Sequence, residues 1–475
     1  MALTEEDLQT LPEEGIDTEN PGKYTDLLSD LQGNILRGHG RDHTVNLFLQ
    51  FKPNQVQQLK AWIKVFAEKI TSAQKQATEA QLYRTQKIAG DLFVNFFITR
   101  KGYEYLEFKP FQIPGDQPFR FGMKNDAIRN LLGDPVIEKW EAGLQKEIHA
   151  LLLIADDNPD SLNNTIVQIT QELDSLAQIV HRDDGFILKN EQGDHIEHFG
   201  FIDGISQPLF LKKDIDKAKE SSDFTKWDPR APLSLVLAKD PNGKLDDSYG
   251  SYLVYRKLEQ DVAAFVGAEQ FLAEKLKIDQ ELAGALMMGR FRDGTPLTNS
   301  DTQTNDTTNN FDFNDDVQAL KCPFHTHVRK TNPRGDTGRV DSSGESFEEA
   351  LQKEKNHRIA RRAVSYGESD YSKPTSNGSG LLFLCFQADI ANQFNFMQAA
   401  WANANNFVEV NVGVDPIIGQ TQPGDGQADQ ANRTQKYPKQ WGEKETETIN
   451  KFNLWVHLQG GEYFFAPSIS SLQNI

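Results

Sequence analysis

Apolar residues recur at every second position in several stretches of the chain, which is the pattern of half-buried β-strands. Every second residue from Val45 to Phe51 is apolar, and this predicts a strand over 44–51. Stretches rich in Val, Ile, Leu and Phe predict further strands at 91–99, 147–155, 249–258, 380–386 and 452–465.

Apolar residues at helical spacing lie between these strands. The expected helices cover 55–80, a segment beginning near Asn158-Pro159, residues 260–288, and a segment after 389. Strand–helix–strand repeats with hairpins between them predict an α+β protein of two ferredoxin-like halves, with antiparallel sheets and peripheral helices. We expect a polar N-terminal lead over 1–30, one half over 31–210 and the other over 211–475.

Three polar stretches interrupt this pattern, at 212–233, 298–316 and 419–444. They are rich in charged residues, Asn, Gln, Thr, Gly or Pro, and are too polar to bury. We therefore expect surface loops there. A role in shaping the entrance to a site is the alternative.

The composition narrows the class of protein. The chain has 475 residues with 50 basic and 69 acidic side chains, a net charge of −19. That excess argues against binding to nucleic acid or to an anionic membrane. Two cysteines give no disulfide framework, and the N-terminal residues lack a secretory signal, so we expect a cytoplasmic protein, with encapsulation or export left open.

The segment 198–208 presents Asp203 between apolar residues and glycines. Gly200 and Gly204 allow a tight turn that brings the backbone close to a ligand. One interpretation is that the turn presents the carboxylate of Asp203 to a cavity. The other is that the carboxylate only caps its own turn.

The segment 322–334 holds Cys322, His325 and His327 within six residues and then a basic run. A zinc or copper site is one hypothesis, although no second Cys/His cluster completes four ligands. A haem needs only one axial histidine, and the neighbouring cations suit its two propionates. A basic surface loop is the third interpretation.

The segment 356–367 concentrates cationic side chains in an acidic protein. They either neutralise the acidic residues just upstream or stabilise negative charge that develops in a cavity. Arg361 and Arg362 are the candidates for the second role.

Taken together and in order, these segments resemble the dye-decolourising peroxidases, a haem-dependent family. The resemblance rests on residues 31–38, 200–204, 288–297, 322–334, 356–367 and 460–468, and so covers most of the chain. The length and the long polar stretches resemble the larger subclass of that family. The resemblance implies halves of the dimeric α+β barrel type and haem b as cofactor.

The resemblance also implies roles for individual residues. His327 matches the axial ligand of the iron, and Asp203 the distal acid–base residue. Arg361 matches the distal arginine, with Arg362 as the adjacent alternative. Asp389 resembles the carboxylate that accepts the N–H of the axial histidine, and Arg329 is the expected propionate partner.

The implied activity is the reduction of hydrogen peroxide coupled to one-electron oxidation of bulky aromatic donors such as dyes and phenolics. A metal-assisted hydrolase built on Asp203 and the Cys322/His325/His327 cluster is an alternative. A haem-binding or iron-handling protein with little turnover is another. Trp227 and Trp441 lie in polar loops and are candidates for electron relays or simply for loop anchors; a homo-oligomer stays open.

Overall fold

The computed structural model describes residues 3–339, 346–368, 375–420, 433–450 and 452–475. Within these ranges eight antiparallel strands form a closed barrel, because β11 pairs with β8 at the two ends of the strand order. The order is β8 (Tyr249–Gln260), β14 (Val456–Ala466), β2 (Phe93–Ile98), β3 (Ala150–Asp156), β1 (His43–Phe51), β4 (Ala177–Phe186), β10 (Val364–Tyr366) and β11 (Gly380–Gln387). The expected α+β barrel is thus confirmed.

The barrel is assembled from two sets of four strands, β1–β4 and then β8, β10, β11 and β14. The two seams between the sets are narrow. β4 meets β10 through the single pair Phe186–Ser365, and β2 meets β14 through Ile98–Phe465. Pairing within each set is far more extensive, which agrees with two halves that join edge to edge.

Aromatic side chains fill the interior of the barrel. The rings of Phe48 on β1 and Tyr255 on β8, strands from opposite sides, lie 4.8 Å apart. Helices cover the outer face around β1–β3, where their apolar sides pack on alternate strand residues. These helices include α3 (Val56–Phe66), α5 (Arg100–Tyr105), α9 (Pro159–Leu173) and α16 (Ile469–Gln473).

Strand β8 serves two environments, because successive side chains point to opposite faces of a sheet. Tyr255 and Lys257 face the barrel interior, where Tyr255 donates to Asp183 of β4. Arg256 and Leu258 face outward and line a cavity on the side of the barrel. This strand therefore joins the fold to the site.

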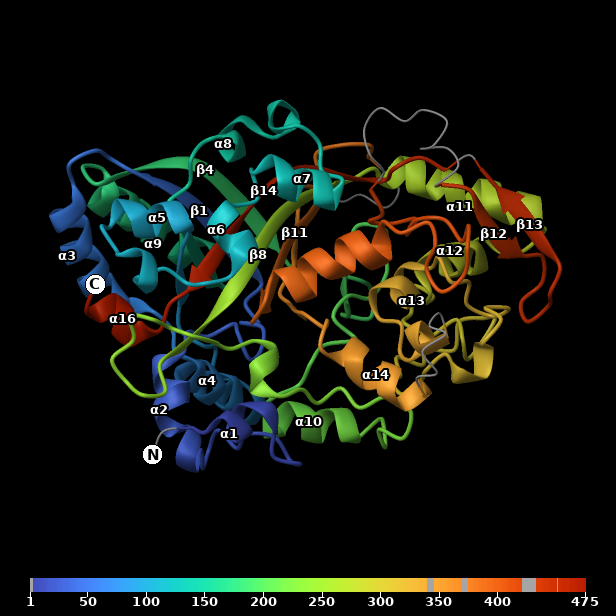
Figure 1. Cartoon of the computed structure of the whole chain (residues 1–475), viewed down its shortest axis with the longest axis horizontal. Helices are drawn as coiled ribbons and strands as arrows, with labels where there is room; N and C mark the ends of the chain where they lie inside the picture. Colours follow the sequence, from blue (N-terminus) through green and yellow to red (C-terminus); the bar gives the residue numbers. More distant parts are fainter. Residues whose placement is uncertain (1–2, 340–345, 369–374, 421–432, 451) are drawn as a thin grey trace.

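A second group of elements packs on that outward side and forms the other end of the molecule (Figure 1). It contains α11 (Val262–Leu276), α12 (Gln280–Met288), α13 (His327–Thr331), α14 (Phe347–Lys355), the π-helical turns η8 (Ala391–Asn395) and η9 (Met397–Ala402), and the hairpin β12 (Gln435–Pro438)–β13 (Thr446–Ile449). Both chain ends lie at the barrel end, near α1 (Glu5–Gln9), α2 (Thr25–Asp30) and α16.

Some predicted boundaries were wrong. The helix expected over 55–80 is two helices, α3 and α4 (Ala73–Gln86), because Ser72 caps the start of the second one through the N–H of Lys75. The helix expected over 260–288 also divides, since Lys277 adopts a left-handed conformation and Asp279 caps α12.

The predicted loops were only partly correct. The loop expected over 212–233 begins with α10 (Lys212–Lys219). The one expected over 419–444 carries β12, and its residues 421–432 lie outside the described part of the chain. No helix within the described residues has the length and apolar character needed to cross a membrane.

Candidate active site

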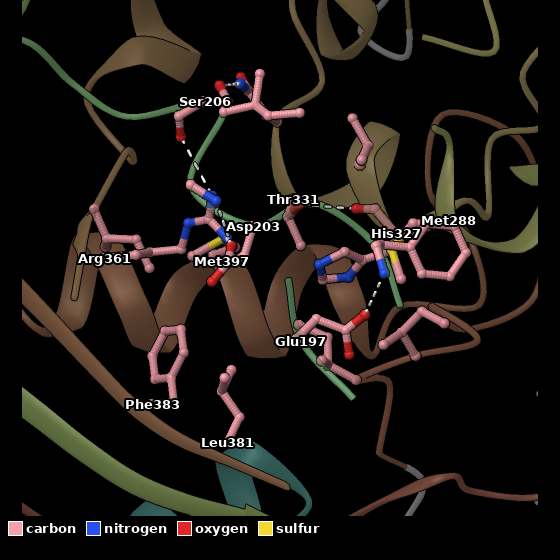
Figure 2. A pocket seen from close by; sticks show the side chains of 18 of the residues that line it. Glu197, Asp203, Ser206, Met288, His327, Thr331, Arg361, Leu381, Phe383 and Met397 are labelled. Carbon is pink, nitrogen blue, oxygen red and sulfur yellow. Dashed lines mark hydrogen bonds and ion pairs between the residues drawn. The ribbon is translucent and has the colours of Figure 1, made fainter. Parts of the chain in front are cut away.

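A cavity of about 260 Å³ lies between the outer face of β8 and the second group of elements. Its walls come from the loop 197–208, from β8, β9 (Ala360–Arg361), β11 and β14, and from α12, α13 and η9. Apolar side chains such as Met288, Leu381, Phe383 and Met397 make up much of the lining (Figure 2). A few polar groups interrupt it, as in a typical cofactor site.

Asp203 reaches this cavity from a tight turn. Gly200 and Gly204 on either side have φ of +91° and +84°, values that glycine adopts without strain. The Oδ1 atom of Asp203 accepts from the N–H of Gly204 at 2.6 Å and from Nη1 of Arg361 at 3.1 Å. Both interpretations of this segment therefore hold, because the carboxylate caps its turn and also lines the cavity.

Arg361 lies on β9, the edge strand beside β11. Its backbone N–H donates to Oε1 of Gln207 at 3.0 Å, which ties β9 to the Asp203 turn. Asp203 and Arg361 are 27% and 31% exposed, and Figure 2 shows them side by side with His327 further along the cavity. The pair is thus accessible to a small ligand.

The alternative, Arg362, is wrong as a cavity residue. Arg362 directly follows β9, where its backbone N–H still donates to Leu384 O of β11 at 2.7 Å, and its side chain does not line the cavity. It donates to the backbone oxygens of Asn34 and Ile35, within the motif 31–38. Arg362 therefore holds the N-terminal segment against the barrel.

His327 is the first residue of α13 and lines the cavity. Its Nδ1 lies 2.8 Å from Oδ2 of the fully buried Asp415. The other oxygen of Asp415 accepts from the N–H groups of Ile417 and Ile418 at 2.7 and 3.1 Å. With Nδ1 committed, Nε2 is the nitrogen left for a ligand, and no described residue hydrogen-bonds to it.

Asp389 was wrongly expected in the position of Asp415. Its carboxylate accepts from the backbone and side-chain N–H groups of Asn392, so it caps η8 instead. The residue that does pair with His327 follows it by 88 positions, and the sequence analysis missed it.

The Cys/His/His cluster does not form. The His325 ring packs edge-on against Tyr437 at 4.6 Å, away from the cavity, and its burial lowers the pKa to about 3. Because α13 starts at His327, the strand-like register that would align the two histidines is absent. Among the described residues the only cluster with metal-ligand types in reach of one another is Glu141, His181 and Asp183, elsewhere in the barrel.

Arg329 was also wrongly expected in the cavity. It lies on α13 but is fully buried and does not line the cavity, and its guanidinium pairs with Asp316 at 2.9 Å and with Asp336 at 2.5 Å. With two carboxylates already bound, it has no role as a propionate partner.

Other cations, which the sequence analysis missed, line the cavity. Arg290 is buried and Arg358 is half-buried, and within the described part of the chain both donate to backbone or amide oxygens rather than to carboxylates. Burial lowers the pKa of each to about 10, so both remain charged at neutral pH. Arg334 stacks on Trp227 behind this wall, with its guanidinium carbon 4.4 Å from the ring centroid.

These features fit an iron porphyrin. The cavity offers one imidazole nitrogen for a metal, apolar walls for a flat macrocycle, and excess positive charge for two carboxylates. Further along the cavity from the imidazole, the carboxylate of Asp203 lies beside the guanidinium of Arg361. An α+β barrel with this site has the features of a haem peroxidase.

Comparisons with known proteins agree with this class. Residues 30–187 match the family model of the DyP dimeric alpha+beta barrel domain, and residues 196–410 match that of the Dyp-type peroxidase C-terminal region. The chain belongs to the dye-decolourising peroxidase family. Members of this family are peroxidases that use haem b, and the chain is accordingly a haem peroxidase of this type.

Individual relatives are similar over nearly the whole chain. The multifunctional dye peroxidase DyP2 of Amycolatopsis sp. is 35% identical over 96% of this chain and 97% of its own. A crystal structure of a DyP-type peroxidase of Anabaena sp. is 61% identical, with a TM-score of 0.95 and 99% of both chains covered. The dye-decolourising peroxidase msp1 of Mycetinis scorodonius is 30% identical over 94% of this chain and 87% of its own.

Proposed function

We propose that this peroxidase uses Asp203 as its distal acid–base residue, Arg361 as the distal cation and His327 as the axial ligand, and that it oxidises dyes and phenolic donors. The observation that carries the assignment is that these three side chains, from three separate elements, line one cavity. Haem b, when bound, supplies the iron at which peroxide is reduced and the oxidising equivalents that the donors take up.

Each residue has a physical task. Asp203 accepts a proton from bound peroxide and returns it to the departing oxygen, as a positioned carboxylate does in general acid–base catalysis. The guanidinium of Arg361 stabilises the negative charge that builds as the O–O bond breaks. Asp415 fixes the proton of His327 on Nδ1 and so directs the Nε2 lone pair into the cavity.

The division of the chain into a lead of 1–30 and halves that meet at residue 210 stays a prediction. The distribution of barrel strands supports it, four before residue 210 and four after. The cavity lining is drawn from residues 197–458, so the second half supplies most of the site.

The test is an absorption spectrum of the haem-loaded protein before and after one equivalent of peroxide. We expect a Soret band, a rapid spectral change with peroxide, and a return to the starting spectrum when an aromatic donor is added. Bleaching without that return would instead indicate a haem-binding or iron-handling protein.

A further inference from the structure

A second carboxylate, Glu197, lines the same cavity as Asp203 and has no role in the steps above (Figure 2). Its Oε2 accepts from the N–H of Phe199 at 2.9 Å, and its Oε1 accepts from the N–H of Phe201 at 3.1 Å. The backbone of Glu197 adds two bonds, from its own N–H to Phe201 O and from Gly200 N–H to its carbonyl.

These four bonds define the turn that leads into Asp203. Gly200 lies at its centre in a left-handed conformation, and Asp203 follows Phe201 by two residues. The ring of Phe199 stacks on Phe265 at 4.3 Å, which anchors the outside of the turn. The carboxylate of Glu197 is thus the inner support of the turn.

Strand β8 holds this carboxylate in place. Gln260 donates from Nε2 to Oε2 of Glu197 at 2.5 Å, and Gln260 is itself 4% exposed. Burial raises the pKa of Glu197 to about 7, which means that the site disfavours the charged carboxylate. Glu197 is half-buried and its charge is disfavoured, yet its donors all belong to one turn and one strand, which indicates a specific positioning task.

We propose that Glu197 is a positioning residue for the peroxide step: it fixes the 199–201 turn so that Asp203 stands beside Arg361 over the cavity. The inference rests on the proposed role of Asp203. On this proposal, Glu197 acts through Asp203 and does not contact the substrate itself.

The experiment compares Glu197→Gln with the parent as haem-loaded proteins. Stopped-flow mixing with peroxide gives the second-order rate of the first step, and steady-state assays give the KM for the aromatic donor. A misplaced catalytic group costs about 10–100-fold, so we expect that loss in the peroxide step, with the donor KM unchanged.

Glu354→Gln is the matched control. Glu354 is a buried glutamate whose pKa, like that of Glu197, is raised to about 7 by burial, and it also accepts from backbone N–H groups, those of Gly335 and Thr337. It does not line the cavity. We expect it to lose stability without losing the peroxide rate.

A double-mutant cycle separates positioning from direct action. In an Asp203→Asn background, Glu197→Gln should change the peroxide rate little further, because the group that it positions is already lost. An equal loss in both backgrounds would overturn the proposal, as would a parent-like rate in the single variant.

If Glu197→Gln does not fold, Gln260→Leu removes the support from β8 and should slow the same step, though less; a parent-like rate in Gln260→Leu would then overturn the proposal. Absence of any peroxide reaction in the parent would contradict the proposed function itself, and this outcome is distinct from failure of the variant.

Discussion

His327 and Asp415 form a buried imidazole–carboxylate pair, 2.8 Å apart, at the start of α13. Asp415 has no exposed surface, and three N–H groups, one from His327 and two from the backbone, surround its oxygens. The carboxylate therefore both orients the imidazole and makes it a stronger electron donor toward a metal.

Replacing this carboxylate tests that effect. Asp415→Asn should lower activity or haem affinity by about 10–100-fold and raise the reduction potential of the bound haem, because a neutral amide is a weaker acceptor. Redox titration and haem titration of the apoprotein measure both quantities. Asp389→Asn, at the residue that caps η8, is the control and should change neither.

The two adjacent arginines of the 356–367 segment allow a second comparison. Arg361→Met should slow the peroxide step by about 10²–10³-fold, since a preorganised cation beside Asp203 is lost. Arg362→Met should lower the melting temperature but leave that step near the parent rate, because the hydrogen bonds of the Arg362 guanidinium to described residues all go to backbone oxygens. A slow peroxide step in Arg362→Met, with a parent-like rate in Arg361→Met, would instead make Arg362 the distal cation.

The buried acid Glu354 makes stability depend on pH. Its folded pKa of about 7 exceeds the ordinary value of 4.5, so between these values the folded state binds more protons than the unfolded state. The contribution of this group to stability therefore falls as pH rises from about 4.5 to 7, by about 3 kcal/mol at most.

Denaturant unfolding of the parent and of Glu354→Gln at pH 5 and pH 7.5 checks this term. The variant is less stable by an amount that does not depend on pH, because its hydrogen bonds are weaker. Its glutamine does not titrate, so the pH-dependent part of the stability is lost. The stability of the variant relative to the parent should therefore improve at the higher pH. A difference that does not change with pH would show that Glu354 titrates normally.

Lys257 supplies the positive charge for acids at one end of the barrel interior. Its Nζ lies 2.7 Å from Asp183 and 2.8 Å from Glu141, and His181 lies beside both. Lys257→Met should destabilise the fold by about 3–5 kcal/mol, because Asp183 would remain buried without a counter-charge. Thermal unfolding measures this, with the half-exposed Lys101→Met as the control.

The surroundings of Trp227 lead us to expect a poor electron relay. It is only 2% exposed, and the cations of Arg334, Lys355 and Arg358 lie 4.4–5.7 Å from its ring. Positive charges so close disfavour removal of an electron from the ring. We expect Trp227→Phe to keep the parent rate with a bulky dye per bound haem; a selective loss with the bulky dye, and not with a small phenol, would restore the relay hypothesis.

The sequence was most informative where the site is local. Asp203, His327 and Arg361 stand in short motifs whose glycines or basic neighbours mark them, and the structure brings all three to one cavity. Asp415 could not be found this way, because its partner lies 88 residues away and no periodic pattern links them.

Charged side chains near a motif were the other source of error. Arg329 and Arg362 have the expected charge, but Arg329 on α13 and Arg362 just after β9 bind other partners away from the cavity. Conversely, Arg290 and Arg358 line it from elements whose arrangement depends on tertiary packing. The sequence predicted that cationic side chains would surround the site, but which of them point into the cavity depends on the fold.

Because the side chains of β8 alternate between two faces, an insertion of one residue has a different effect on this strand from an insertion of two. A single inserted residue would exchange the side chains of the cavity with those of the barrel interior, placing Lys257 and Arg256 on the wrong sides. Two inserted residues would restore the faces but displace every later group by about 6.6 Å along the strand. Variation in length must therefore accumulate in the polar stretches away from this strand, while the cavity itself changes only by substitution.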